Sequence, residues 1–177
     1  MGAGPDPFVR ARNATKRYGD EIAVQGLTLD VAPGTILGIV GPSGSGKTTA
    51  IRMLTGVTAP TEGDVSVFGV PPTAFKPAQR ARLGYMPQLS VLFPHLSLHE
   101  NLNFVASIYG LTLRRRARLR EALAFVGLEG DRRKQLRQTS GGMQRRLALA
   151  ATLLHQPDLL FPDEPTVGID PLLRRKF

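Results

Sequence analysis

The pattern of hydrophobic and polar positions changes character twice along the chain, and it predicts strands, then helices, then strands again. Residues 8–18 and 22–31 alternate between apolar and polar side chains, which predicts two antiparallel strands. Residues 36–40 are continuously apolar apart from a glycine and predict a buried strand. Residues 64–69 and 83–86 predict two further short strands.

Residues 97–128 carry almost no strand signal and predict an all-helical insertion. Ser97 and Glu100 have the spacing of a capping box, in which each side chain hydrogen-bonds the backbone N–H of the other residue. Apolar side chains follow at helical spacing, at Leu98, Leu102, Val105 and Ile108, and then at Leu119, Leu123 and Val126.

Residues 41–48, Gly-Pro-Ser-Gly-Ser-Gly-Lys-Thr, fit the phosphate-binding pattern G-x-x-x-x-G-K-[ST]. They stand between the predicted strand 36–40 and a predicted helix that includes residues 49–54. Glycines allow successive backbone N–H groups to point at phosphate oxygens, and the helix N-terminus adds partial positive charge there. We expect Lys47 to reach the β- and γ-phosphates and the Thr48 hydroxyl to bind Mg²⁺. A chance glycine-rich turn would lack these flanking elements.

A second chemical feature is the acid pair that follows the predicted strand 159–161 and Pro162. A carboxylate at this position in a phosphate-loop protein holds Mg²⁺, directly or through water, which predicts that role for Asp163. The next acid, Glu164, is placed to take a proton from an attacking water. The alternative is an ordinary Asp-Glu pair that caps a helix or loop.

Ser140, Gly141 and Gly142 open a predicted helix that runs to about residue 155. A Ser/Gly-rich helix N-terminus is a possible anion site. One chain contains a single phosphate loop for a nucleotide. A second anion site therefore predicts contact with a nucleotide that a partner chain holds. The alternative is an ordinary N-cap followed by two glycines.

Composition narrows the class of protein further. The 177 residues suit one domain, and 42% hydrophobic residues support a real core. The absence of cysteine excludes disulfides, thiolate metal sites and a cysteine nucleophile. No apolar run approaches the roughly 18 residues of a membrane span, and residues 1–6 lack the order of a signal peptide. We therefore expect a cytosolic protein or one peripheral to a membrane.

The formal net charge is +9 and the pI is about 10.8. Much of the excess lies in helix-like segments, and no aromatic residues interleave there to stack on bases. This favours a solvated or partner-facing helical surface over nucleic-acid binding, and attraction to a membrane surface stays open.

These motifs identify a resemblance that covers nearly the whole chain. The chain resembles the ATP-binding cassette ATPases, the nucleotide-binding subunits of ABC transporters, and more specifically the branch that serves bacterial drug and polysaccharide exporters. The family's motifs occur in the family's order: Walker A at 41–48, the Q-loop glutamine at Gln88, the signature at 140–142, Walker B at 159–163 with Glu164 after it, and the D-loop at 167–170.

The resemblance implies an α/β fold, the P-loop NTPase core of the ABC ATPase type with an antiparallel β subdomain and a helical insertion. It implies a single domain over 1–177, divided into a core with the antiparallel strands and Walker A at 1–93, a helical subdomain at 94–140, and the signature helix, Walker B and D-loop at 141–177. The family's switch histidine lies beyond the D-loop, so we expect the C-terminal strands and helices of the domain to be missing here.

The resemblance also implies ATP and Mg²⁺ as cofactors and a role for each site residue. Glu164 would be the general base, assisted by Lys47 and Gln88. Mg²⁺ would be held by Thr48, Gln88 and Asp163. The nucleotide would be held by Tyr18 (stacked on adenine), Gly41, Pro42, Ser43, Gly44, Ser45, Gly46, Lys47, Thr48 and Thr49, with Ser140, Gly141 and Gly142 closing on the γ-phosphate of the other subunit.

The function implied is that of an ATPase subunit at the cytoplasmic face of the membrane. It would pair head-to-tail with a second ATPase subunit and dock its helical insertion on a transmembrane permease that exports a substrate. One alternative is a nucleotide-binding module that does not hydrolyse ATP competently, and another is a soluble ABC ATPase outside transport.

Pro162 departs from the family pattern, in which an apolar strand residue is usual. Either the proline bends the strand before Asp163, or residue 162 lies at the end of the strand, where its backbone nitrogen has no hydrogen-bond partner to lose.

Overall fold

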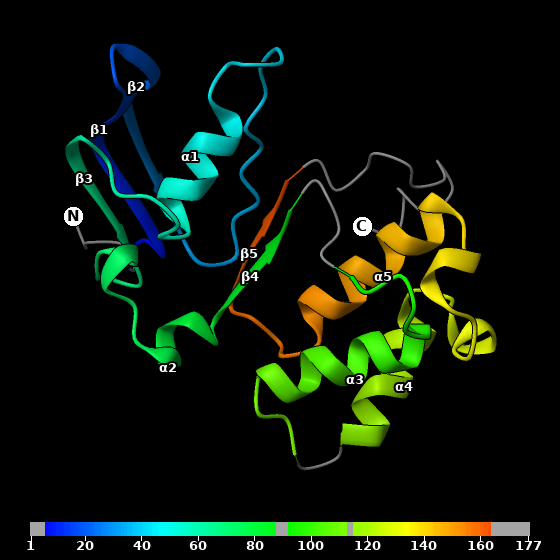
Figure 1. Cartoon of the computed structure of the whole chain (residues 1–177). Coiled ribbons are helices and arrows are strands. Elements are labelled where there is room, and N and C mark those ends of the chain that lie inside the picture. The colour runs from blue at the N-terminus through cyan, green and yellow to red at the C-terminus, as the bar shows by residue number, and fades with distance from the viewer. Residues whose placement is uncertain (1–5, 88–91, 113–114, 164–177) are drawn as a thin grey trace. The chain divides into compact units, whose positions relative to one another are not determined.

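The computed structural model describes residues 6–87, 92–112 and 115–163, which divide between Arg80 and Ala81 into two compact units (Figure 1). The chain contains antiparallel strands, a helix that follows the phosphate loop and a helical segment, in the order that the sequence predicts. Among the described helices, none is long and apolar enough to cross a membrane.

The first unit is built on an antiparallel sheet with the strand order β2-β1-β3. Strand β1 spans Val9–Tyr18, β2 spans Glu21–Val31 and β3 spans Glu62–Val67. β1 pairs with both neighbours, and Val9 stands opposite Val31 on one side and Val67 on the other. The predicted strands before the loop are therefore confirmed, and the strand predicted at 64–69 begins two residues earlier.

Helix α1, Lys47–Leu54, lies against the sheet through its contacts with β2 and β3. It buries Ala50, Ile51, Met53 and Leu54, and Met53 is only 1% exposed. A 3₁₀ turn at Pro72–Ala74 and the short helix α2, Pro77–Arg80, complete this unit. Burial of one apolar face holds α1 in place. The N-terminus of α1 directly follows the glycine-rich loop.

The predicted buried strand at 36–40 is wrong. These residues have no regular secondary structure, and the side chains of Ile36 and Val40 are each 96% exposed. A strand that is apolar on both faces depends on neighbours for its hydrogen bonds and its burial. Within the first unit the described sheet consists of β1, β2 and β3, and none of these strands pairs with residues 36–40.

The second unit combines a parallel strand pair with a helical core (Figure 1). Strand β4, Leu83–Met86, pairs with β5, Leu159–Pro162. Helices α3, α4 and α5 contact one another. Their bounds are Leu98–Ile108, Arg115–Phe125 and Gly141–Leu153, with 3₁₀ turns at Glu129–Asp131 and Leu136–Gln138.

The helical insertion is confirmed together with its predicted cap. The Ser97 hydroxyl accepts from the Glu100 N–H at 3.2 Å, and the Glu100 carboxylate accepts from the Ser97 N–H at 2.8 Å. Most of the apolar positions chosen from the helical spacing are buried in one cluster, namely Leu98, Leu102, Leu119, Leu123 and Val126. Val105 is half-buried and packs against this cluster, whereas Ile108 is exposed, at 65%.

Of the three histidines, His95 and His99 are exposed. His155 follows α5 but is half-buried, and its ring stacks on Tyr109 with centroids 3.8 Å apart. Burial lowers the pKa of His155, which favours the neutral form of the ring. His155 therefore helps to join the end of α3 to the end of α5.

Pro162 is accommodated at the end of β5. The N–H groups of Leu159 and Asp163 donate to Arg82 and Met86 on the β4 side, at 3.2 and 2.8 Å. Since N–H groups alternate between the two sides of a strand, the nitrogen of residue 162 faces away from β4. The proline therefore costs no hydrogen bond between β4 and β5, and the pairing continues past it to Asp163.

Candidate nucleotide-binding site

The phosphate loop enters α1 through a glycine that no other residue can replace without strain. Gly46 is the N-cap of α1 and has φ of 85°, in the left-handed region. A Cβ atom at this position would lie 2.1 Å from the carbonyl oxygen of Ala23 and 3.0 Å from a methyl group of Val24. The loop therefore passes directly against the backbone of β2, which fixes the start of the helix.

Lys47 turns back over the loop that precedes it. Its ammonium group donates to the carbonyl oxygens of Gly41 and Pro42 at 2.8 and 2.7 Å. The Ser45 N–H donates to the Pro42 carbonyl at 3.2 Å, which closes the turn. A lysine in this place puts its charge beside the loop, where phosphate oxygens can replace the two carbonyl acceptors.

The N-terminus of α1 has no side-chain cap and no acidic residue in its first turn. The first intrahelical bond that uses Gly46 runs from the Ala50 N–H to the Gly46 carbonyl, at 2.8 Å. The earlier N–H groups of a helix lack intrahelical acceptors and carry the positive end of its dipole. Together with half-buried Thr48 and Thr49, this end of α1 is suited to a phosphate group.

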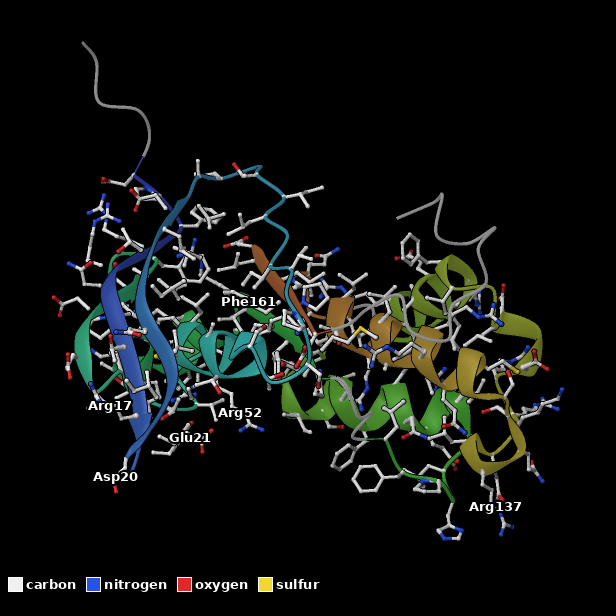
Figure 2. The ribbon with its side chains drawn as sticks, turned by 90° about the horizontal axis from the view of Figure 1, so that it is seen from above. Arg17, Asp20, Glu21, Arg52, Arg137 and Phe161 are labelled. Carbon is white, nitrogen blue, oxygen red and sulfur yellow. The ribbon has the colours of Figure 1, made fainter. Side chains whose placement is uncertain are left out.

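Tyr18 lies at the end of β1, where 49% of its side chain is exposed. Figure 2 labels its charged neighbours Arg17, Asp20 and Glu21 at this end of the β1–β2 hairpin. The Lys16 ammonium lies over the Tyr18 ring, 5.3 Å from its centre, and this cation–π contact covers one face of the ring. Adenine stacking on Tyr18 stays a prediction.

In the second unit Asp163 directly follows β5 and is only 5% exposed. Arg145, a residue of α5, contacts Asp163. The Arg145 guanidinium donates to the Asp163 carbonyl at 2.6 Å and to the Pro87 carbonyl at 2.9 Å. Arg145 is itself 7% exposed. One buried side chain thus joins α5 to the carboxyl ends of both β4 and β5.

The sequence analysis missed Arg145, although it lies five residues after the predicted signature serine. An arginine at one helix position gives no sign of whether it is buried. The available signal is its helical spacing to Ala148 and Leu149, which lie three and four residues later on the same face of α5 and are buried.

The signature residues lie at the start of α5. Ser140 is the N-cap, and its hydroxyl accepts from the Met143 N–H at 3.3 Å. Ser140 and Gly141 are exposed, and Gly142 is half-buried. This agrees with an ordinary N-cap and also leaves the helix N-terminus open to an anion from outside the chain.

The predicted site residues are divided between the two units. Tyr18 and residues 41–49 belong to the first, whereas residues 140–142 and Asp163 belong to the second. Gln88, Glu164 and the D-loop at 167–170 lie outside the described residues.

The residues present suit Mg²⁺ held with a nucleotide better than a metal held by protein alone. The described residues contain no cluster of three or more histidine or acidic side chains that could hold a metal ion. Magnesium in nucleotide sites takes one or two protein oxygens and completes its shell with phosphate and water. The Thr48 hydroxyl in the first unit and the buried Asp163 carboxylate in the second are each a ligand of this kind.

Comparison with known proteins places these motifs in a family. The family model described as "ABC transporter" matches residues 24–167. A Nod factor export ATP-binding protein I from Cupriavidus metallidurans is 43% identical over 168 residues, and a linearmycin resistance ATP-binding protein from Bacillus subtilis is 38% identical over 168 residues. Both alignments cover 94% of this chain, and they cover 55% and 54% of those proteins. The chain thus spans about half the length of these relatives.

Solved structures agree with this fold. An ATP-binding subunit of an ABC transporter superposes with a TM-score of 0.84 at 27% identity, covering 95% of this chain and 70% of that one. A dimeric ATP-binding cassette in a post-hydrolysis state, bound to ADP and Pi, gives 0.83 at 30% identity, covering 95% and 78%. The predicted fold class, a P-loop core of the ABC type, is confirmed.

We predict that Gly46→Ala abolishes phosphate binding by the loop, because the new methyl group collides with the Ala23 carbonyl at 2.1 Å. Gly44→Ala is the matched control, since Gly44 has a similar φ of 80° but no atom within 4 Å of the added carbon. ATP affinity should fall below detection in the first variant and by less than about tenfold in the second, because the backbone strain of Gly44→Ala, of order 1–3 kcal/mol, is present in the free and the bound chain alike. Equal losses of affinity would contradict the proposed collision.

We further predict that Arg145→Met destabilises the chain by about 2–4 kcal/mol, because two carbonyl acceptors lose a charged donor. Arg146→Met is the control, since Arg146 is half-buried and donates to one carbonyl, that of Val126, at 2.9 Å. Urea unfolding would measure both variants. A loss no larger at 145 than at 146 would show that the contact between α5 and the two strands is dispensable.

Proposed function

The chain belongs to the family of ABC transporter ATP-binding domains, and on that premise we propose that it is the ATP-binding and ATP-hydrolysing subunit that powers export by a membrane transporter. The observation that carries the proposal is the geometry of the loop at 41–46. It enters α1 through a left-handed glycine, with Lys47 folded over its carbonyls and an uncapped helix N-terminus behind it.

ATP would be bound by its phosphates in this loop and by its adenine on Tyr18. The amides of residues 43–49 and the Lys47 ammonium would share the charge of the phosphates, and the ammonium would exchange two neutral carbonyl partners for charged ones. The ammonium would gain Coulomb attraction to the charged phosphate oxygens that neutral carbonyl oxygens do not supply, so this exchange favours the bound state.

Hydrolysis would use residues from both ends of the sequence. Thr48, Asp163 and Gln88 would hold Mg²⁺, which neutralises developing charge on the phosphates when bound. Glu164 would accept a proton from the attacking water as its oxygen bonds to the γ-phosphorus, and the bond to the oxygen that bridges the β- and γ-phosphates would break. ADP and inorganic phosphate would leave.

A second ATPase subunit would complete each site. The exposed N-terminus of α5, with Ser140 and Gly141 at its tip, presents a helix dipole to a γ-phosphate held by the partner. Because the chain itself offers one loop of the 41–48 type, two copies arranged head-to-tail would sandwich two ATP molecules. The dimeric ADP-bound cassette to which this chain is similar supports this arrangement.

The permease would dock on the second unit at the cytoplasmic face of the membrane. A largely apolar groove of about 400 Å³ runs along β4, α3 and α5, and its lining includes Pro87, Ile108 and Tyr109. Ile108 is 65% exposed and Tyr109 is 38% exposed, so apolar surface is available there. Pro87 directly precedes Gln88, which would connect a docked partner to the Mg²⁺ ligands.

The proposed direction of transport is export. This direction rests on the names of the relatives, which concern Nod factor export and linearmycin resistance.

We predict that Lys47→Ala lowers the affinity for Mg-ATP beyond detection, because the side chain supplies the charge on the β- and γ-phosphates. Isothermal titration calorimetry of the parent and the variant would measure the change. Arg52→Ala is a control on the same helix, since Arg52 is exposed in the last turn of α1 (Figure 2). Unchanged affinity in Lys47→Ala would refute the loop as the ATP site.

A further inference from the structure

A second concave site, unrelated to the phosphate loop, lies in the helical part of the second unit. It encloses about 660 Å³ between α3, α4 and the 3₁₀ turn at Glu129–Asp131. Its charged and ionisable lining is His99, Arg115, Arg116, Arg120, Glu129 and Arg132, and we name this site the basic pocket. Four guanidinium groups therefore face one carboxylate.

One wall of the basic pocket is fixed in advance. Arg115 donates to the Asn103 side-chain oxygen at 2.8 Å and to the Ser107 hydroxyl at 2.6 Å, and it also donates to the Asn103 carbonyl. These bonds fasten the start of α4 to α3 and hold a guanidinium at the pocket wall. On the opposite wall the His99 N–H donates to the Arg132 carbonyl at 3.0 Å, which keeps these two residues adjacent.

The remaining cations are available to a ligand. Arg116 and Arg120 lie one helical turn apart on α4, and both are exposed. Neither forms an ion pair with another residue in the part of the chain that the structure describes. Like charges at this spacing repel each other, so a ligand with several negative charges relieves an unfavourable interaction.

The floor of the basic pocket is apolar. Leu119 and Leu123 line it and are each 1% exposed, because they belong to the helical core. Walls of low polarizability strengthen the field of the surrounding charges. Guanidinium groups pair with phosphate oxygens through parallel hydrogen bonds, which makes phosphate the anion that this set of side chains fits best.

We propose that the basic pocket binds a polyvalent phosphate group, with Arg116 and Arg120 as its movable ligands and Arg115 as its fixed one. The phosphate would come either from a soluble polyphosphate or from the headgroup of an anionic lipid. This assignment does not rest on ATP binding by residues 41–48, because no residue is shared between the two sites.

The test uses the full chain carrying Lys47→Ala, so that binding at the phosphate loop is weakened. Inorganic triphosphate is titrated by calorimetry at low salt, and vesicles of phosphatidylcholine with and without cardiolipin, whose headgroup carries two phosphates, are tested by sedimentation. The pocket variants are Arg116→Gln/Arg120→Gln and Arg116→Glu/Arg120→Glu. The control is Arg137→Glu, an exposed arginine of the same unit outside the basic pocket (Figure 2).

We expect saturable binding that weakens at least about tenfold in the Gln pair, further in the Glu pair, and by no more than about twofold in Arg137→Glu. Dependence on the pocket arginines with triphosphate identifies a soluble ligand, and dependence with anionic vesicles alone identifies a lipid headgroup. The proposal fails if no probe binds, or if the pocket variants and Arg137→Glu lose affinity equally. Thermal melts of each variant exclude unfolding as the cause.

Discussion

The second unit depends on one buried cation, the guanidinium of Arg145. A charged group removed from water is unfavourable by several kcal/mol unless polar partners surround it. Arg145 finds them in the carbonyls of Pro87 and Asp163, at the carboxyl ends of β4 and β5. Because α5 begins at Gly141, this contact fixes the helix proposed to face a partner's nucleotide relative to the strand proposed to supply the metal ligand.

The first unit has a corresponding constraint at Gly46. Its left-handed backbone lies so close to β2 that no side chain fits, and this places the uncapped end of α1 beside the loop. In the proposed function, nucleotide recognition would use backbone N–H groups, whose positions are set by folding and need no side-chain ordering. The loop would then hold phosphate through its geometry, and Lys47 would add the charge.

Much of the fold could be predicted because local patterns decide it. The capping box at Ser97 and the helical spacing of Leu98 and Leu102 are confirmed, since both are short-range. The prediction of a strand at 36–40 was wrong. A strand that is apolar on both faces needs partner strands from distant parts of the sequence, and its own residues do not specify them. Arg145 and the basic pocket escaped prediction for the same reason: burial and concavity arise only when helices far apart in sequence come together.

The measurement that tests the central claim most directly is the rate of Mg-ATP hydrolysis by the parent chain and by Glu164→Gln. Removal of a general base lowers the rate by about a hundredfold or more, while ATP affinity should stay within about twofold of the parent value. We predict that outcome, with phosphate release as the readout and ATP titration as the control. Equal rates in the two chains, or no hydrolysis by the parent, would contradict the assignment of this chain as an ATPase that uses Glu164.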